Sequence, residues 1–153
     1  MKDRIEQDYK IALRQRDILT LAVLRLLKSA ISAAETSQKT RRALSDAEII
    51  EVIQRQVKQR KESVEQYRAA GRNDLADIEA GEMSILENYL PEQLDRETIE
   101  KLVKEIIVNI PLNTLNKGMV MKELMPKIKG KADGKLVNEI VTEQLLLAGL
   151  DAK

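Results

Sequence analysis

Aliphatic side chains recur at intervals of three and four residues along nearly the whole chain, and this spacing constrains its fold more than any other feature. One regular stretch has apolar side chains at Ile99, Leu102, Val103, Ile106, Ile107 and Ile110. Such spacing brings apolar side chains to one side of an α-helix, where they can pack against other helices. No segment shows the convincing alternation of apolar and polar residues that marks a strand. We therefore predict an all-α fold.

Capping residues and helix breakers divide this pattern into seven predicted helices. Asp17, Asp95 and Asp133 each precede an apolar repeat and can cap a helix N-terminus. Ser45 and Glu48 fit a capping box, in which each side chain bonds the other residue's backbone amide. The predicted helices span about residues 1–14, 18–31, 45–70, 73–90, 95–110, 118–127 and 133–148.

Pro91 separates the first four predicted helices from the last three, and segment 90–94 is the expected boundary. We predict an N-terminal four-helix domain, residues 1–91, followed by a C-terminal three-helix domain, residues 92–153. A chain of 153 residues can hold two small domains, and the first four helices could form an antiparallel bundle. The helix expected at 18–31 is apolar on nearly every side, which predicts an inner position.

The chain contains no histidine and no cysteine, which removes many kinds of chemistry. Disulfides, thiolate metal sites and cysteine nucleophiles are excluded, as are an imidazole base and histidine-ligated metals. The sequence has no phosphate-binding loop, dinucleotide fingerprint or nucleophile elbow. Its carboxylates are interspersed with lysines and arginines, which is typical of solvated helix faces. We therefore expect no catalytic residue, no cofactor and no metal site.

The longest apolar run, residues 18–27, is interrupted by Thr20 and Arg25 and is too short to span a bilayer. The first four residues are mostly charged and lead into an amphipathic segment rather than an apolar signal core. We therefore expect a soluble protein of the cytoplasm that does not bind membranes.

Residues 117–138 are the most unusual part of the sequence, with six lysines and two acidic residues and hence a local charge of +4. The whole chain carries only +1. We predict here a short helix, a basic turn and the start of a second helix, whose free amides and dipole favour an anion. Glycines in the turn would let a phosphate approach the backbone. The candidate nucleic-acid-binding residues are Lys117, Lys122, Lys127, Lys129, Gly130, Lys131, Gly134 and Lys135.

A second basic region is expected where the loop 36–42 precedes the exposed face of the helix predicted from residue 45. The candidate residues of this secondary patch are Lys39, Arg41, Arg42, Arg55, Lys58 and Lys61. Arg60 is expected on the same exposed face, and Arg25 at a helix edge, paired with a carboxylate. Because residues 117–138 contain no aromatic ring, bases cannot stack there, and the expected mode is recognition of the shape and phosphates of a folded RNA. Solvation alone can also explain lysine-rich turns.

Several runs of residues resemble the GatB/YqeY family. They are Leu90-Pro91-Glu92-Gln93-Leu94, the stretch from Lys117 to Met125-Pro126-Lys127, Lys129-Gly130-Lys131-Ala132-Asp133-Gly134 and Val137-Asn138. Segments 12–17, 24–27, 60–63 and 70–75 also match, so the resemblance covers nearly the full chain, which is similar to a free-standing YqeY-like protein. This chain departs from the family at Met119, where lysine is frequent, and at Lys122, where glycine is frequent.

The resemblance implies an all-helical fold with an N-terminal helical domain and a C-terminal three-helix domain. The same module forms the tail of the B subunit of the glutamine-dependent aspartyl/glutamyl-tRNA amidotransferase and is appended to some glutaminyl-tRNA synthetases. In those proteins it is associated with holding tRNA, and the amide-transfer chemistry lies in other domains.

We therefore expect a tRNA-binding accessory protein, linked to tRNA-dependent amidation or aminoacylation, without a catalytic site of its own. Its expected partners are tRNA and an aminoacyl-tRNA synthetase or amidotransferase. One alternative is a subunit of, or partner in, a carbon–nitrogen ligase that uses glutamine as amide donor. Another is a helical module that docks onto other proteins through its apolar grooves.

Overall fold

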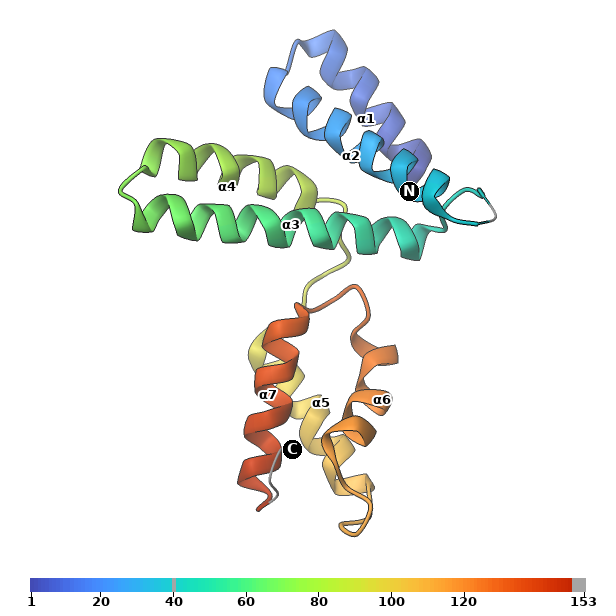
Figure 1. Ribbon diagram of the computed structural model, residues 1–153, viewed down its shortest axis with the longest axis vertical. Helices are drawn as coiled ribbons and strands as arrows, with labels where there is room; N and C mark the ends of the chain where they lie inside the picture. The colour runs from blue at the N-terminus through green and yellow to red at the C-terminus, as the bar shows by residue number, and fades with distance from the viewer. Residues whose placement is uncertain (40, 150–153) are drawn as a thin grey trace. The chain divides into compact units, whose positions relative to one another are not determined.

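The computed structural model describes residues 1–39 and 41–149, and in these ranges it contains seven α-helices and no strand (Figure 1). This confirms the all-α class. The helices are α1 (Lys2–Gln15), α2 (Ile18–Ser37), α3 (Asp46–Ala69), α4 (Asn73–Glu87), α5 (Arg96–Asn109), α6 (Lys117–Ile128) and α7 (Gly134–Leu147). The chain divides into two compact units, Met1–Leu90 and Pro91–Lys153. That these units are separate domains stays a prediction.

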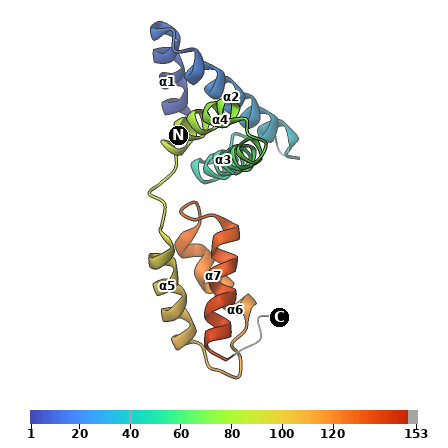
Figure 2. The ribbon, with the colours of Figure 1, turned by 90° about the vertical axis from the view of Figure 1, so that its left-hand side faces the viewer.

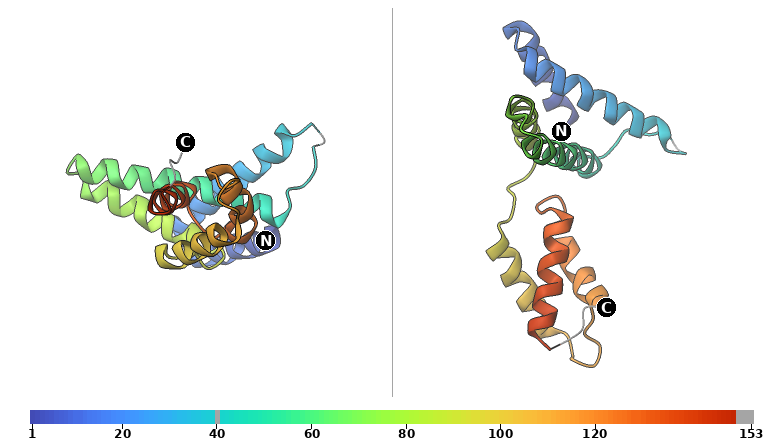
Figure 3. Two further views of the ribbon diagram at one scale, coloured as in Figure 1. Left: turned by 90° about the horizontal axis from the view of Figure 1, so that it is seen from below. Right: turned by 60° about the vertical axis from the view of Figure 1, so that its left-hand side comes forward.

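The N-terminal unit consists of two helical hairpins, α1 with α2 and α3 with α4. In the right-hand view of Figure 3, α3 and α4 are seen nearly end-on and α2 lies across them. All four helices contribute apolar side chains to one core. Its most enclosed members are Ile5, Val23, Leu24, Leu27, Ile49, Ile53 and Leu86.

Helix α2 is longer than predicted: it continues to Ser37 instead of ending near residue 31. Ala30 and Ala34 pack against the core of the unit. One turn further along α2 than Ile31, the carboxylate of Glu35 accepts hydrogen bonds from Lys2 Nζ at 2.8 Å and from the Leu44 amide at 3.1 Å. The helix therefore includes Thr36 and Ser37, the first two residues of the segment that was predicted to be a loop.

The inner position predicted for α2 is wrong. Val23, Leu24, Leu27 and Ile31 are buried, but Ile18 is 80% exposed and Leu26 is 56% exposed. Packing against the other helices covers one side of α2 only, so its apolar residues on the opposite side face solvent.

The α3–α4 hairpin begins at the predicted capping box. The Glu48 amide donates to Ser45 Oγ at 3.3 Å, and the Ser45 amide donates to a Glu48 carboxylate oxygen at 2.7 Å. Gly71 has the left-handed backbone (φ 72°) that ends α3 and leads into α4. Arg60 was expected on the exposed face of α3 but is buried, because its guanidinium lies 3.1 Å from the Glu82 carboxylate of α4.

In its described residues, 91–149, the C-terminal unit contains three helices around a second core. Helices α5 and α7 run in the same direction and α6 runs opposite to them (Figures 1 and 2). The buried residues of this core are Ile99, Val103, Ile106, Leu115, Val120, Leu124, Ile128, Val137, Ile140, Val141 and Leu145. Asp95 and Asp133 cap α5 and α7 as predicted, and Asn116, which was expected in a loop, caps α6.

Within residues 1–39 and 41–149, no helix combines the length and the apolar character needed to cross a lipid bilayer.

Candidate nucleic-acid interface

Residues 127–135, which comprise the end of α6, the connection to α7 and the start of α7, are called here the lysine turn. The Lys129 amide donates to the Met125 carbonyl at 3.0 Å, and the Lys131 amide donates to the Ile128 carbonyl at 2.8 Å. Between them, Gly130 adopts a left-handed conformation with φ 79°, which glycine accepts at little steric cost. The turn therefore has a defined backbone that reverses the chain within a few residues.

The residues preceding α5 hold this turn in place. The side-chain amide of Gln93 donates to the Gly130 carbonyl at 3.0 Å, and the Leu94 amide donates to the Lys131 carbonyl at 2.8 Å. Gly130 is buried as a result, so its role in the structure is to shape the turn. A fixed backbone of this kind reduces the ordering cost of binding a ligand.

The start of α7 offers a mixed environment to an anion. Asp133 accepts a hydrogen bond from the Leu136 amide at 3.4 Å, and its carbonyl accepts one from the Val137 amide at 3.0 Å. In the part of the chain that the structure describes, no acceptor is found for the amides of Gly134 and Lys135. The Asp133 carboxylate partly offsets the attraction of the helix dipole for a phosphate. Attraction for phosphate must therefore come mainly from the lysine side chains.

The predicted lysines do not all lie together. Lys127, Lys129, Lys131 and Lys135 are exposed within the lysine turn, and Lys122 is exposed in the middle of α6. Lys117 begins α6, about 15 Å from Lys127 at 1.5 Å per residue. It is half-buried, and its Nζ donates to Thr142 Oγ1 at 3.1 Å. We take the four lysines of the turn as the centre of the candidate interface.

The secondary patch predicted in the N-terminal unit is partly neutralised. Arg42 donates two hydrogen bonds to the Glu48 carboxylate, at 2.9 and 2.7 Å. The hydrogen bonds from Arg42, followed by that from the Ser45 amide, lower the pKa of Glu48 to about 2. Arg42 therefore supports the start of α3, and its charge is already balanced.

The remaining residues of the secondary patch are exposed, but the face that they form is not uniformly basic. Lys39 and Arg41 lie in the loop before α3. Arg55, Lys58 and Lys61 are exposed on α3. Two exposed acidic residues, Glu62 and Glu65, follow Lys58 and Lys61 at intervals of four residues, which places opposite charges on the same side of the helix.

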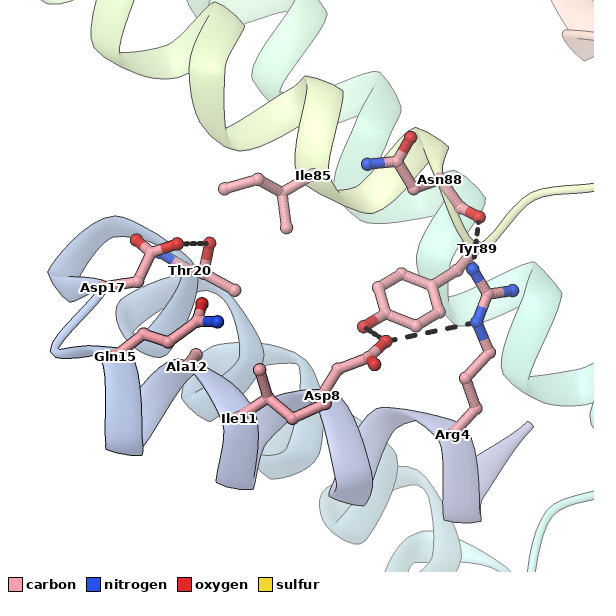
Figure 4. A pocket seen from close by; sticks show the side chains of 10 residues that line it. All are labelled: Arg4, Asp8, Ile11, Ala12, Gln15, Asp17, Thr20, Ile85, Asn88 and Tyr89. Carbon is pink, nitrogen blue, oxygen red and sulfur yellow. Dashed lines mark hydrogen bonds and ion pairs between the residues drawn. The ribbon is translucent and has the colours of Figure 1, made fainter.

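A cavity of about 440 Å³ in the N-terminal unit, which the sequence did not indicate, is lined by α1, the start of α2 and the end of α4 (Figure 4). Figure 4 shows Asp8, Tyr89 and Arg4 grouped at one side of it and Asp17 at the other. The Tyr89 hydroxyl donates to Asp8 at 2.5 Å, and Arg4 donates to the Asn88 carbonyl at 3.0 Å. Burial, followed by the hydrogen bond to Asp8, raises the pKa of Tyr89 above its ordinary range.

No local pattern pointed to this cavity, because its lining comes from segments far apart in the chain, as in the hydrogen-bonded pair of Asp8 and Tyr89, which are 81 residues apart. Across residues 1–39 and 41–149, no group of three or more acidic side chains is placed to hold a metal ion.

The fold and the lysine turn define an all-helical protein with an exposed basic turn in its C-terminal unit. The family model for Yqey-like proteins matches residues 2–145, and the chain therefore belongs to the YqeY-like protein family. This confirms the resemblance to free-standing YqeY-like proteins over nearly the whole chain.

Fungal relatives agree with this assignment. "Altered inheritance of mitochondria protein 41, mitochondrial" of Pyrenophora tritici-repentis is 29% identical over 143 residues, which are 92% of this chain and 78% of the relative. The protein of the same name in Saccharomyces cerevisiae is 27% identical over 133 residues, 84% of this chain and 70% of the relative. An uncharacterized protein of Schizosaccharomyces pombe is 34% identical over 79 residues, 52% of this chain and 61% of the relative. Because two of these names are mitochondrial, a cytoplasmic location stays a prediction.

Proposed function

We propose that this protein binds folded RNA of the tRNA type through the lysine turn, and acts as an accessory factor in tRNA-dependent amidation or aminoacylation without a catalytic site of its own. The observation that supports this proposal best is the way in which the turn is held. Gln93 and Leu94 bond the carbonyl oxygens of Gly130 and Lys131, so that exposed lysines project from a fixed backbone.

The physical basis of binding is the release of counterions from the RNA backbone. Each lysine that replaces a condensed cation at a phosphate contributes to affinity, and this contribution falls as salt concentration rises. The exposed lysines of the turn follow one another at intervals of two to four residues, so several can reach neighbouring phosphates. This mode reads the positions of phosphates in a folded RNA and needs no aromatic side chain.

The proposal is tested by measuring the affinity of the full chain for unfractionated tRNA over a series of salt concentrations. Three single variants replace Lys127, Lys129 or Lys131 by alanine. Each should reduce the slope of log affinity against log salt concentration by about one. Lys104→Ala removes an exposed lysine from α5 of the same unit and serves as the matched control. Absence of binding at low salt, or slopes that none of the three replacements changes, would contradict the proposal.

A further inference from the structure

The cavity of Figure 4 contains polar groups that the fold itself does not use. The side-chain carboxamides of Gln15, at the end of α1, and Asn88, at the C-terminal cap of α4, both belong to its lining. In the described part of the chain no hydrogen-bond partner is found for either carboxamide, and Asn88 bonds Arg4 through its backbone carbonyl. Each carboxamide therefore offers a donor and an acceptor, side by side, to a molecule in the cavity.

The charged groups of the lining, in contrast, are already paired. Asp8 accepts a hydrogen bond from the Tyr89 hydroxyl and lies 4.0 Å from the Arg4 guanidinium. Arg4 also lies over the Tyr89 ring, 4.8 Å from its centre. Asp17 accepts hydrogen bonds from the amide and the hydroxyl of Thr20, at 3.1 and 2.7 Å. The groups that remain for a ligand are therefore mainly neutral.

Apolar side chains form walls between the two carboxamides. Figure 4 shows Ile85 above the cavity and Ile11 below it, with Gln15 at one end and Asn88 and the Tyr89 ring at the other. Ile11 is 47% exposed, so a ligand could cover part of its surface. The volume of about 440 Å³ lies within the range of small-molecule sites. A flat, uncharged ring with hydrogen-bonding edges fits this combination.

Neutral carboxamides favour adenine among the flat rings of biology. A carboxamide pairs through both of its polar atoms with the adjacent donor and acceptor of adenine. Adenine has such a pair at its Watson–Crick edge and another at its Hoogsteen edge, and its amino group has one hydrogen for each. Guanine is most often bound by arginine, and Arg4, the arginine of the lining, is already engaged.

Two arginines beside the cavity favour a ligand that carries phosphate. Arg14 and Arg16 flank Gln15 in the chain and are exposed, and neither has an ion pair within residues 1–39 and 41–149. Their charges disfavour a cationic ligand at this end of the cavity and attract the phosphate of a nucleotide.

We propose that the cavity binds the adenine ring of a nucleotide, either free or in unpaired RNA. The ring lies between Ile11 and Ile85, and the carboxamides of Gln15 and Asn88 bond its two edges. The phosphate extends past Gln15 toward the two arginines. The cavity belongs to the N-terminal unit and the lysine turn to the C-terminal unit, so the inference does not depend on RNA binding by the lysine turn.

The first experiment titrates the full, isotopically labelled chain with adenosine monophosphate and follows the side-chain amide resonances by nuclear magnetic resonance. The resonances of Gln15 and Asn88, assigned with Gln15→Leu and Asn88→Leu, should shift on binding. The resonance of Gln7, an exposed glutamine of α1 outside the cavity, should not. A shift confined to residues outside the cavity would overturn the proposal.

Equilibrium dialysis measures the affinities. Gln15→Leu should weaken the binding of adenosine monophosphate by about ten-fold, since a bidentate contact to a base contributes discrimination of this order. Gln7→Leu, the matched control on the same helix, should leave it unchanged, as should Lys127→Ala, which separates this test from that of the lysine turn. Adenosine, which lacks the phosphate, should bind several-fold more weakly in low salt.

A short oligoadenylate distinguishes the two sources of the base. Tighter binding of the oligoadenylate than of adenosine monophosphate, lost in Gln15→Leu, would assign the base to unpaired RNA, whereas binding that is no tighter would assign it to a free nucleotide. The proposal is overturned if neither binds, if guanosine or cytidine monophosphate binds as tightly as adenosine monophosphate, if adenosine does so, or if Gln15→Leu and Gln7→Leu have equal effects. Circular dichroism of each variant verifies that it is folded.

Discussion

The side-chain amide of Gln93 donates a hydrogen bond to the backbone carbonyl oxygen of Gly130, and the two atoms lie 3.0 Å apart. The same nitrogen lies 2.8 Å from the Pro91 carbonyl oxygen, so one amide connects the entry to α5 with the lysine turn. Gly130 is buried, and a buried carbonyl oxygen without a partner is costly. The bond therefore fixes the backbone from which the lysines project.

Replacement of Gln93 by alanine should lower the free energy of unfolding by about 1 kcal/mol, because it leaves the Gly130 carbonyl unpaired. We also expect the affinity for tRNA to fall by a few fold, because the turn must then be ordered on binding. Urea denaturation followed by circular dichroism and the salt-series assay measure the two effects. Gln59→Ala, which removes an exposed glutamine from α3, is the control. If the Gln93 variant unfolds at the same urea concentration as the unchanged chain, the hydrogen bond to Gly130 does not stabilise the fold.

Gly134→Ala separates the contribution of the backbone from that of the lysines. A Cβ at this position would meet nothing within 4 Å, and alanine in a helix loses less chain entropy than glycine. The free energy of unfolding of this variant should therefore be about 0.5 kcal/mol higher than that of the unchanged chain. If a phosphate approaches the first amides of α7, the added methyl group should lower tRNA affinity by about three-fold, a loss of about 0.6 kcal/mol. Higher stability with unchanged affinity would assign binding to the lysine side chains alone.

The ionisation of Glu48 makes the stability of the N-terminal unit depend on pH. The hydrogen bonds from Arg42 and the Ser45 amide lower its pKa from 4.5 to about 2 in the folded chain. The carboxylate therefore stabilises the fold above pH 4.5, and this contribution is lost as the pH falls toward 2. Glu48→Gln should have a lower midpoint temperature at pH 7 than the unchanged chain, and the difference should narrow between pH 4.5 and pH 2.

Thermal melts over this pH range provide the measurement. Glu62→Gln removes an exposed carboxylate from the same helix, and its side chain has no ion pair in the described part of the chain. Its midpoint should follow that of the unchanged chain at every pH. A constant gap between the Glu48 variant and the unchanged chain would mean that the ion pair does not account for the pH dependence.

Local signals in the sequence were enough to predict the helices and most of their caps. The capping box at Ser45 and the cap at Asp95 each depend on a few neighbouring residues, and both are found in the structure. The lysine turn was also predicted from local signals, because lysine, glycine and the Asp133 cap are close in sequence. The hydrogen bond from Gln93 that holds the turn was not predicted, since nothing near Gln93 in the sequence indicates a partner 37 residues away.

The failures concern long-range packing. Arg60 has the spacing of an exposed residue, and only the position of Glu82 on the next helix explains its burial. The sequence of α2 is apolar on nearly every side and indicated an enclosed helix, yet Ile18 faces solvent because the described helices of the unit pack against the opposite side of α2. The cavity beside Tyr89 was not predicted either, because it too depends on how helices far apart in the sequence pack together. Periodicity shows which side of a helix is apolar, but not what lies against it.

The buried pair of Arg60 and Glu82 provides the last prediction. The Arg60 and Glu82 side chains are 10% and 20% exposed, respectively, so removing the arginine leaves a poorly solvated carboxylate. Arg60→Met alone should lower the free energy of unfolding by about 3 kcal/mol, whereas Arg60→Met combined with Glu82→Leu should restore most of it. Urea denaturation of both variants and of Glu82→Leu completes a double-mutant cycle. Additive losses in the double variant would show that the two charges do not interact, and that Arg60 contributes through the packing of its stem.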